Sequence, residues 1–292
     1  MKQFAKLLVW MGILGILFVT TVFGQEELFQ RGINGDNPSF QQQIHMWIDD
    51  LSKQKGFEHF KKARWEVSPL GPGTDSLLVL LTLDDREIGY FIVSATPDGK
   101  WMLSEYGTGQ YPPFSPSMLK QSLQIYLHEP PTSVRQSERI YLDPFHAVWK
   151  LTFADGKTTI LDGVTGEILP LEADDLVKNK KAPPLSELSL QSGAPLEMME
   201  SLQFSTFDPY ESIHWLTDNP LPLKSAEEIA AYLKKHGKLT YAGQLFEGKI
   251  LSPFAVIGFH QWVNGPLYLA VDHQGLRWIP VGFFTENGAF FP

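Results

Sequence analysis

The sequence of 292 residues contains no cysteine. This absence excludes a disulfide framework, a thiolate metal ligand, a cysteine nucleophile and a lipid attached through an N-terminal cysteine. Small exported domains often depend on disulfides, but a chain of this length can bury a core large enough to fold without them. The lack of cysteine is therefore compatible with an exported bacterial protein.

Recognisable catalytic and metal-binding motifs are also missing from the sequence. No G-x-S-x-G nucleophile elbow occurs, and His128-Glu129 lacks the second histidine that the zinc motif H-E-x-x-H requires. Gly107-Thr108-Gly109 lacks the lysine and the following helix of a phosphate-binding loop. The sequence therefore predicts no cofactor and no metal site, and no residue is assigned a catalytic role.

Positive charge is scarce. Lysine and arginine number 24 against 33 aspartates and glutamates, which gives a formal net charge of −9. Three lysines lie between Lys178 and Lys181, but Glu172, Asp174 and Asp175 precede them, as is typical of a solvated linker. Because nucleic-acid binding needs clustered basic residues that neutralise phosphates, we expect no nucleic-acid partner.

The N-terminus has the charge pattern of an export or anchoring segment. Lys2 and Lys6 precede seventeen uncharged residues, Leu7 to Phe23. As a helix these would span about 26 Å, slightly less than the hydrocarbon layer of roughly 30 Å, yet they exceed the usual signal-peptide core of about 7–15 residues. Residues 1–24 are therefore predicted to be either a signal peptide cleaved after Gly24 or a membrane anchor, with the rest outside the cytoplasm.

Residues 25–169 are predicted to form an α+β region. Apolar residues recur at helical spacing from Ser39, an expected N-cap, to about Lys55. Glu87–Gly109 reads as a β-hairpin, because alternating apolar residues flank the turn sequence Thr96-Pro97-Asp98-Gly99.

A second helix and a second β unit follow in the same region. Ser115-Pro116 is expected to open the helix. Three short strands are expected at 139–142, 147–153 and 158–162, with Asp155-Gly156 as a hairpin turn.

Two segments of this region carry a resemblance to known modules. DGKTTILDGVTGEIL, at 155–169, resembles the terminal hairpin of PepSY-type modules, in which a strand ends in a D-x-x-T-G-E-[IV] turn. GYFIVSATPDGKWMLSEYGTG, at 89–109, resembles part of the propeptides of streptopain-type exported bacterial cysteine peptidases. The resemblance implies a helix-plus-antiparallel-sheet module used outside the cytoplasm for inhibition, chaperoning or peptide contact, and it brings no catalytic residue.

The composition changes after residue 169. Residues 170–203 are rich in acidic residues, proline and serine, and are predicted to be a linker with short helical pieces such as Pro195–Leu202. Residues 204–292 are predicted to be a β-rich domain with one capping helix. Ser225 and Glu228 form an expected capping box at the start of that helix, and Gly237 follows its end.

Four strands are expected in the C-terminal domain, joined by glycine-containing turns that favour hairpins. Their expected ranges are 239–246, 250–262, 266–272 and 276–284.

The closest approach to a catalytic constellation lies in these strands. Asp272 and His273 are adjacent, and His260 lies on a neighbouring predicted strand. A carboxylate and an imidazole that converge can act as an acid/base pair, although Asp272-His273-Gln274-Gly275 is also ordinary turn composition. Asp143 and His146 form a similar pair with less support.

The sequence as a whole favours an extracytoplasmic α+β protein, membrane-anchored through its N-terminal segment or secreted, that binds a peptide or protein without catalysis. Two alternatives remain open. One is a peptidase-like hydrolase acting on peptide or cell-wall material through carboxylates or the Asp272/His273 pair. The other is a structural envelope or spore-associated protein.

Overall fold

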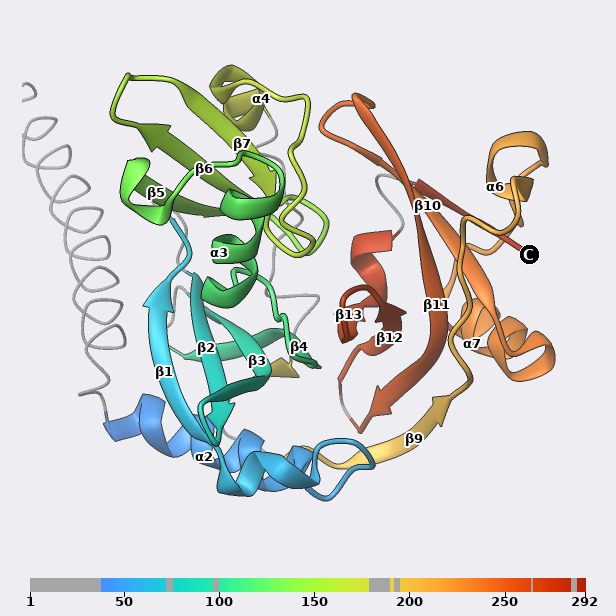
Figure 1. Cartoon of the computed structure of the whole chain (residues 1–292). Helices are drawn as coiled ribbons and strands as arrows, with labels where there is room; N and C mark the ends of the chain where they lie inside the picture. Colours follow the sequence, from blue (N-terminus) through green and yellow to red (C-terminus); the bar gives the residue numbers. More distant parts are fainter. Residues whose placement is uncertain are drawn as a thin grey trace, which may run out of the picture.

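Antiparallel sheets dominate the fold, and the helices are few (Figure 1). The structure is a computed structural model that describes residues 38–71, 76–96, 100–178, 190–191, 195–263, 265–284 and 288–292. The predicted apolar segment Leu7–Phe23 lies outside the described residues. No helix among the described residues is long and apolar enough to cross a membrane.

The first layer is the helix α2 (Pro38–Leu51), which buries Phe40, Ile44 and Trp47 at helical spacing. The helix begins one residue before the expected N-cap and ends before Lys55, where a short 3-10 turn η1 (Glu58–Lys62) follows. The amphipathic helix expected in this stretch is therefore confirmed, with a shorter C-terminal end.

The second layer is a meander of four strands. Its members are β1 (Arg64–Pro69), β2 (Ser76–Leu83), β3 (Arg86–Ala95) and β4 (Trp101–Thr108). The β3–β4 pair is the predicted hairpin, whose turn residues 97–99 lie outside the described part of the chain. Side chains alternate across a strand, so Phe91 and Val93 face α2 while Tyr90 and Ile92 face the opposite side.

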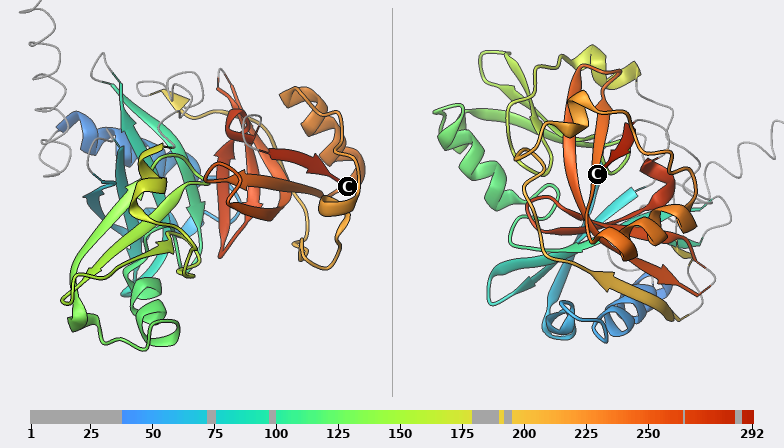
Figure 2. Two further views of the ribbon diagram at one scale, coloured as in Figure 1. Left: turned by 90° about the horizontal axis from the view of Figure 1, so that it is seen from above. Right: turned by 90° about the vertical axis from the view of Figure 1, so that its right-hand side faces the viewer.

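The third layer is a separate three-stranded sheet on that opposite side (Figure 2). Its strands are β5 (Val134–Tyr141), β6 (Ala147–Phe153) and β7 (Thr158–Asp162). Before it come α3 (Pro116–Ile125) and the short turn η2 (Pro131–Ser133), and the Ser115 hydroxyl caps α3 by accepting a hydrogen bond of 3.0 Å from the Met118 amide. The second helix, β6 and β7 are thus where the sequence predicts them, whereas β5 begins at Val134, well before the predicted start at Arg139, and ends at Tyr141.

The predicted linker contains regular structure. It includes α4 (Ala173–Lys178), β8 (Leu190–Gln191), which pairs with β4, and β9 (Met198–Gln203). The helical piece predicted at Pro195–Leu202 is wrong, because alternate residues of β9 are exposed and the strand pairs with β11. Pairing with a distant strand is a tertiary contact that local propensity does not reveal.

The C-terminal part is an antiparallel sheet packed by α7 (Ala226–His236). The Ser225–Glu228 capping box is present, and Gly237 ends the helix in the left-handed conformation. The other elements are α6 (His214–Thr217), β10 (Leu239–Leu245), β11 (Ile250–Trp262), β12 (Leu267–Asp272), β13 (Leu276–Pro280), η3 (Val281–Phe284) and β14 (Gly288–Phe291). The last predicted strand therefore ends at Pro280 rather than at Phe284.

The long strand β11 organises this sheet. Its first half pairs with β10, its second half pairs with β9, and β12 runs along its other edge.

The two parts of the chain share one eleven-stranded sheet through β4 and β13. Three residue pairs make this connection, Leu276 with Thr108, Arg277 with Gly107 and Trp278 with Tyr106. A Cβ atom on Gly107 would lie 2.5 Å from the Leu276 carbonyl oxygen, so glycine permits the close approach of the strands. The predicted domain limits stay predictions, but the β4–β13 pairing places residues of both regions side by side.

Candidate functional site

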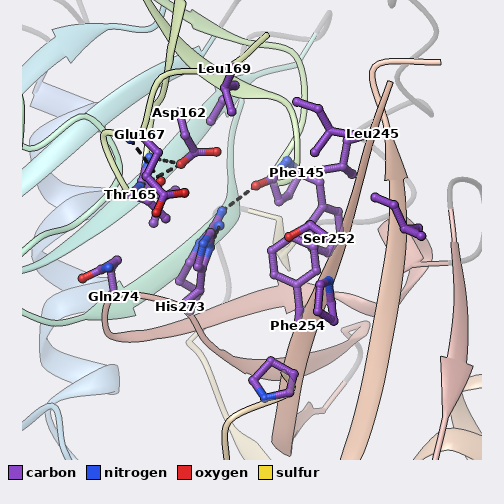
Figure 3. Close-up of a pocket in the computed structure, with 18 of the residues that line it drawn as sticks. Phe145, Asp162, Thr165, Glu167, Leu169, Leu245, Ser252, Phe254, His273 and Gln274 are labelled. Atoms are coloured by element: carbon purple, nitrogen blue, oxygen red, sulfur yellow. Dashed lines mark hydrogen bonds between the residues drawn. The ribbon is translucent and has the colours of Figure 1, made fainter. Parts of the chain in front are cut away.

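A cavity of about 440 Å³ lies where the two parts of the chain meet (Figure 3). We call it the junction pocket. Its walls come from five segments, which are residues 144–147 between β5 and β6, 162–169 after β7, 208–210, 245–254 around the β10–β11 turn, and 272–277 around the β12–β13 turn.

One wall of the junction pocket is apolar. Phe145 packs against Phe254 with ring centroids 5.1 Å apart, and Leu245 completes this surface. At the rim, the side chain of Tyr210 is 62% exposed and that of Leu251 is 44% exposed. The pocket therefore offers a ligand both a buried apolar wall and an exposed apolar edge.

The other wall is acidic. Four carboxylates line the pocket, those of Asp162, Glu167, Asp208 and Asp272, and Arg277 is the one arginine or lysine among its described lining residues. One oxygen of Asp162 accepts hydrogen bonds from the backbone amides of Val164 and Thr165, at 2.8 and 2.7 Å, which shapes the loop after β7.

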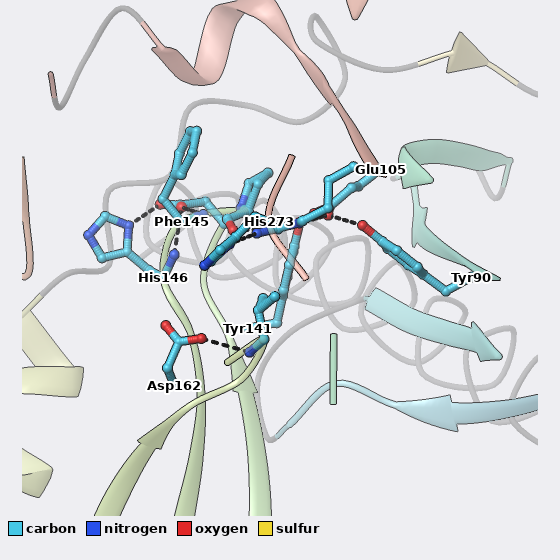
Figure 4. A network of polar contacts seen from close by, with 11 residues as sticks. Tyr90, Glu105, Tyr141, Phe145, His146, Asp162 and His273 are labelled. Atoms are coloured by element: carbon cyan, nitrogen blue, oxygen red, sulfur yellow. Dashed lines mark hydrogen bonds and ion pairs between the residues drawn. The ribbon is translucent and has the colours of Figure 1, made fainter. Parts of the chain in front are cut away.

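Arg277 is buried and belongs to a polar network whose members Tyr90, Glu105, Tyr141 and His273 are labelled in Figure 4. Its Nε donates to Oε1 of Glu105 at 2.8 Å, and its Nη2 donates to the carbonyl oxygen of Pro144 at 2.6 Å. Glu105 also accepts hydrogen bonds from the hydroxyl of Tyr141 at 3.0 Å and from the hydroxyl of Tyr90. We call Tyr90, Glu105, Tyr141 and Arg277 the ionic hub.

The ionic hub holds its charges in place. Burial is the largest influence on the pKa of Arg277 and lowers it, but Glu105 and Tyr90 together outweigh burial and hold this pKa above its usual value. Burial first, and then the charge of Glu105, raise the pKa of Tyr90 and Tyr141 well above the usual value, so both phenols stay protonated as donors. Arg277 and Glu105 therefore form a closed charge pair behind the pocket wall.

His273 is held by the same arginine. Nη1 of Arg277 lies 3.3 Å from Nδ1 of His273. Because a guanidinium can only donate, Nδ1 must accept, and the imidazole proton is on Nε2. Burial, reinforced by Arg277 and opposed by Asp162 and Asp272, lowers the pKa of His273 to about 4, so the ring is neutral near pH 7.

The other two predicted site residues have separate partners. Asp272 accepts a hydrogen bond from the Thr206 hydroxyl. His260 is outside the described lining of the pocket; its ring is stacked on Trp278 with centroids 3.3 Å apart, and its Nδ1 accepts from the Tyr106 hydroxyl at 2.8 Å. Burial lowers the pKa of His260 to about 3. The fold thus brings Asp272 and His273 to one pocket and places His260 in an aromatic core.

Asp143 and His146 connect two walls of the pocket through hydrogen bonds. The Phe246 amide donates to Nε2 of His146 at 3.1 Å, so Nδ1 carries the proton and donates to Asp143 at 2.7 Å. This fixes residues 144–147 against the β10–β11 turn. Both ring nitrogens of His146 are engaged, which is the arrangement of a positioning residue.

The sequence reasoning missed the acidic lining residues Asp162, Glu167 and Asp208, and it missed Glu105 and Arg277 of the ionic hub. Each of the last two is a charged residue inside a strand that is buried on both faces, in WMLSEYGT and LRWIP. Buried charges need a partner. One acidic and one basic residue in two otherwise apolar strands therefore indicated that the two strands could lie side by side. No group of three or more histidine, aspartate or glutamate residues in the described part of the chain is arranged to hold a metal ion.

Comparison with known proteins gives no family. No protein-family model matches the chain, and a search of the curated proteins finds no significant match. The resemblance to PepSY-type modules and to streptopain-type propeptides therefore stays a prediction.

Proposed function

We propose that this chain is a non-catalytic binding protein that works outside the cytoplasm, either anchored by residues 1–24 or secreted without them, and that the junction pocket binds a segment of a peptide or protein. The extracytoplasmic address rests on the charge pattern of Lys2, Lys6 and Leu7–Phe23.

One observation carries the binding role. The pocket combines an apolar wall with titratable groups that already have partners inside the protein. Arg277 is bound to Glu105 and Pro144, Nδ1 of His273 accepts from Arg277, and Asp272 accepts from Thr206. A general base needs a free lone pair within reach of its substrate. Because Nδ1 of His273 accepts from Arg277 and Nε2 carries the proton, His273 has no free lone pair. The geometry therefore supports binding more strongly than acid/base catalysis by the Asp272/His273 pair.

The absence of native cysteine makes the proposal easy to test. A single Leu251→Cys substitution at the pocket rim can be labelled with a benzophenone maleimide, and the labelled full-length protein is then photolysed in native cell extract. The matched control is Glu66→Cys, on the exposed side of the edge strand β1. We expect adducts with a peptide or protein from the Leu251 position only.

A second variant ties the adducts to the pocket. Ser252→Trp places a large ring in the cavity, and it should remove the adducts from the Leu251 position. Equal adducts from both positions, or adducts that survive Ser252→Trp, would contradict the proposal. Peptide hydrolysis by the purified protein that is lost in Asp272→Ala and His273→Ala would favour the hydrolase alternative instead.

A further inference from the structure

The charge on the lining of the junction pocket is unbalanced. Four carboxylates and one guanidinium line it, but the guanidinium of Arg277 is already neutralised by Glu105, at 2.8 Å, behind the wall. The nearest lysine along the chain, Lys249, forms an ion pair of 2.6 Å with Asp175. The four carboxylates therefore face the cavity without a compensating cation from the described lining residues.

These carboxylates keep capacity to bind a ligand. Glu167 and Asp208 are exposed. One oxygen of Asp208 accepts from the Tyr210 amide at 2.9 Å, and Asp272 accepts from the Thr206 hydroxyl. A carboxylate has about four acceptor sites, so each of these groups can accept further hydrogen bonds from a cation.

Two of the four carboxylates lie across the pocket from the apolar side chains. Figure 3 shows Asp162 and Glu167 on one side, with Phe145, Leu245 and Phe254 across the cavity. A ligand that satisfies both walls must carry a positive charge on an apolar stem. Lysine and arginine side chains have this form, because a hydrocarbon chain ends in a charged head.

Exposed apolar residues continue from the rim of the pocket. Tyr210 is 62% exposed, and Ile213 and Leu216 farther along the same segment are 63% and 56% exposed. Exposed large apolar side chains mark interaction surfaces when they lie together. Tyr210, which lines the rim, offers a contact for an apolar residue of the ligand beside its charged side chain.

We infer that the junction pocket binds a lysine or arginine side chain of a peptide that carries apolar residues beside it. This inference rests on the proposed binding function and names the chemistry of the ligand. Charge complementarity between the four carboxylates and a cationic side chain carries it, and a pocket of about 440 Å³ has the size of a small-ligand site.

Short synthetic peptides test the inference. The probes are acetyl-Ala-Phe-Lys-Leu-Ala-amide and two relatives in which norleucine or glutamate replaces lysine, titrated by calorimetry into the full-length protein in mild detergent. Norleucine keeps the apolar stem and removes the charge. We expect the lysine peptide to bind about tenfold more tightly than the norleucine peptide at low salt, with the difference shrinking as salt screens the charges.

Substitutions locate the effect. Glu167→Gln removes one exposed charge from the pocket and should weaken the lysine peptide about threefold while leaving the norleucine peptide unchanged. Glu66→Gln, the same change on the edge strand β1, should alter neither affinity.

Failure of the inference and failure of the proposed function give different results. If the lysine and norleucine peptides bind equally and Ser252→Trp removes both, the pocket binds peptides but the charge preference is wrong. If none of the three peptides binds, or if Ser252→Trp leaves binding intact, both the inference and the peptide-binding role of the pocket are overturned.

Discussion

The two faces of strands β3, β4 and β13 bury opposite kinds of side chain. One face carries Phe91, Tyr106 and Trp278, which pack in an aromatic core. The next residue toward the N-terminus on each strand points the other way. These residues are Tyr90, Glu105 and Arg277, three of the four members of the ionic hub.

The difference shows how one sheet manages two kinds of buried polar group. On the aromatic face, His260 is neutral, and a single hydrogen bond to Tyr106 satisfies its Nδ1. On the ionic face, Glu105 lies against Arg277 and accepts hydrogen bonds from three donors. Since desolvation of a charge costs far more than desolvation of a neutral ring, the stability of the ionic face depends above all on the pairing of Glu105 with Arg277.

The largest effect should come from removing one charge of the ionic hub. Glu105→Ala leaves Arg277 charged and buried, and should lower the free energy of unfolding by about 3–5 kcal/mol. Arg277→Met leaves Glu105 buried without its cationic partner, and it should lower the free energy of unfolding by a similar amount. Urea denaturation of the purified variants measures both losses.

A double-mutant cycle sharpens this prediction. The double variant Glu105→Leu/Arg277→Met should lose clearly less unfolding free energy than the sum of the Glu105→Leu and Arg277→Met single variants, because no charge is left without a partner. The half-buried pair Lys150–Glu138, at 2.9 Å, serves as the control, with an expected coupling of about 1 kcal/mol or less. If the losses of unfolding free energy in the two single variants simply added up in the double variant, Glu105 and Arg277 would not be energetically coupled.

A smaller effect is expected on the aromatic face. The Tyr106 hydroxyl donates to His260 and accepts from Nε1 of Trp262 at 3.1 Å. Tyr106→Phe leaves both buried nitrogens without this partner and should cost about 1–3 kcal/mol. Tyr141→Phe is the matched change on the ionic face. Tyr141→Phe should lower the free energy of unfolding less than Glu105→Ala does, because Tyr90 and Arg277 still donate to Glu105. Equal losses for these two variants would contradict the comparison of the two faces.

The third prediction concerns the stability of the folded protein at acidic pH. Because the pKa of His260 is about 3 when folded and about 6.5 when unfolded, the unfolded chain takes up a proton that the folded chain does not. The free energy of unfolding should therefore fall as the pH drops from about 6.5 toward 3, by up to about 1.4 kcal/mol per pH unit from this residue.

His260→Gln isolates that contribution, since glutamine can accept the Tyr106 hydroxyl but does not titrate. The difference in unfolding free energy between the native protein and this variant, measured by urea denaturation at several pH values, should narrow as the pH falls. A constant difference would exclude His260 as a source of acid sensitivity.

Much of the secondary structure could be predicted because its signals are local. The hairpin of β3 and β4 follows from alternating apolar residues around a turn sequence, and α7 follows from its capping box and Gly237. The strand β9 was missed because its partner β11 is distant in sequence and no local residue signals the pairing.

The site was only partly predictable for the same reason. Asp272 and His273 could be selected as candidates, and they line the junction pocket. Their partners, Thr206 and Arg277, come from the tertiary fold. Glu105 and Arg277 are separated by 172 residues, and the pocket walls come from segments that no sequence period connects.

The separation of Glu105 from Arg277 also sets an order for assembly. A chain is synthesised from its N-terminus, so β3 and β4 are complete long before β13 exists, and Glu105 must wait for its cationic partner. Strands β3 and β4 can pair early, but Glu105 meets Arg277 only when almost the whole chain has been synthesised. A product that stops before β13 therefore lacks the arginine that pairs with Glu105 in the folded sheet.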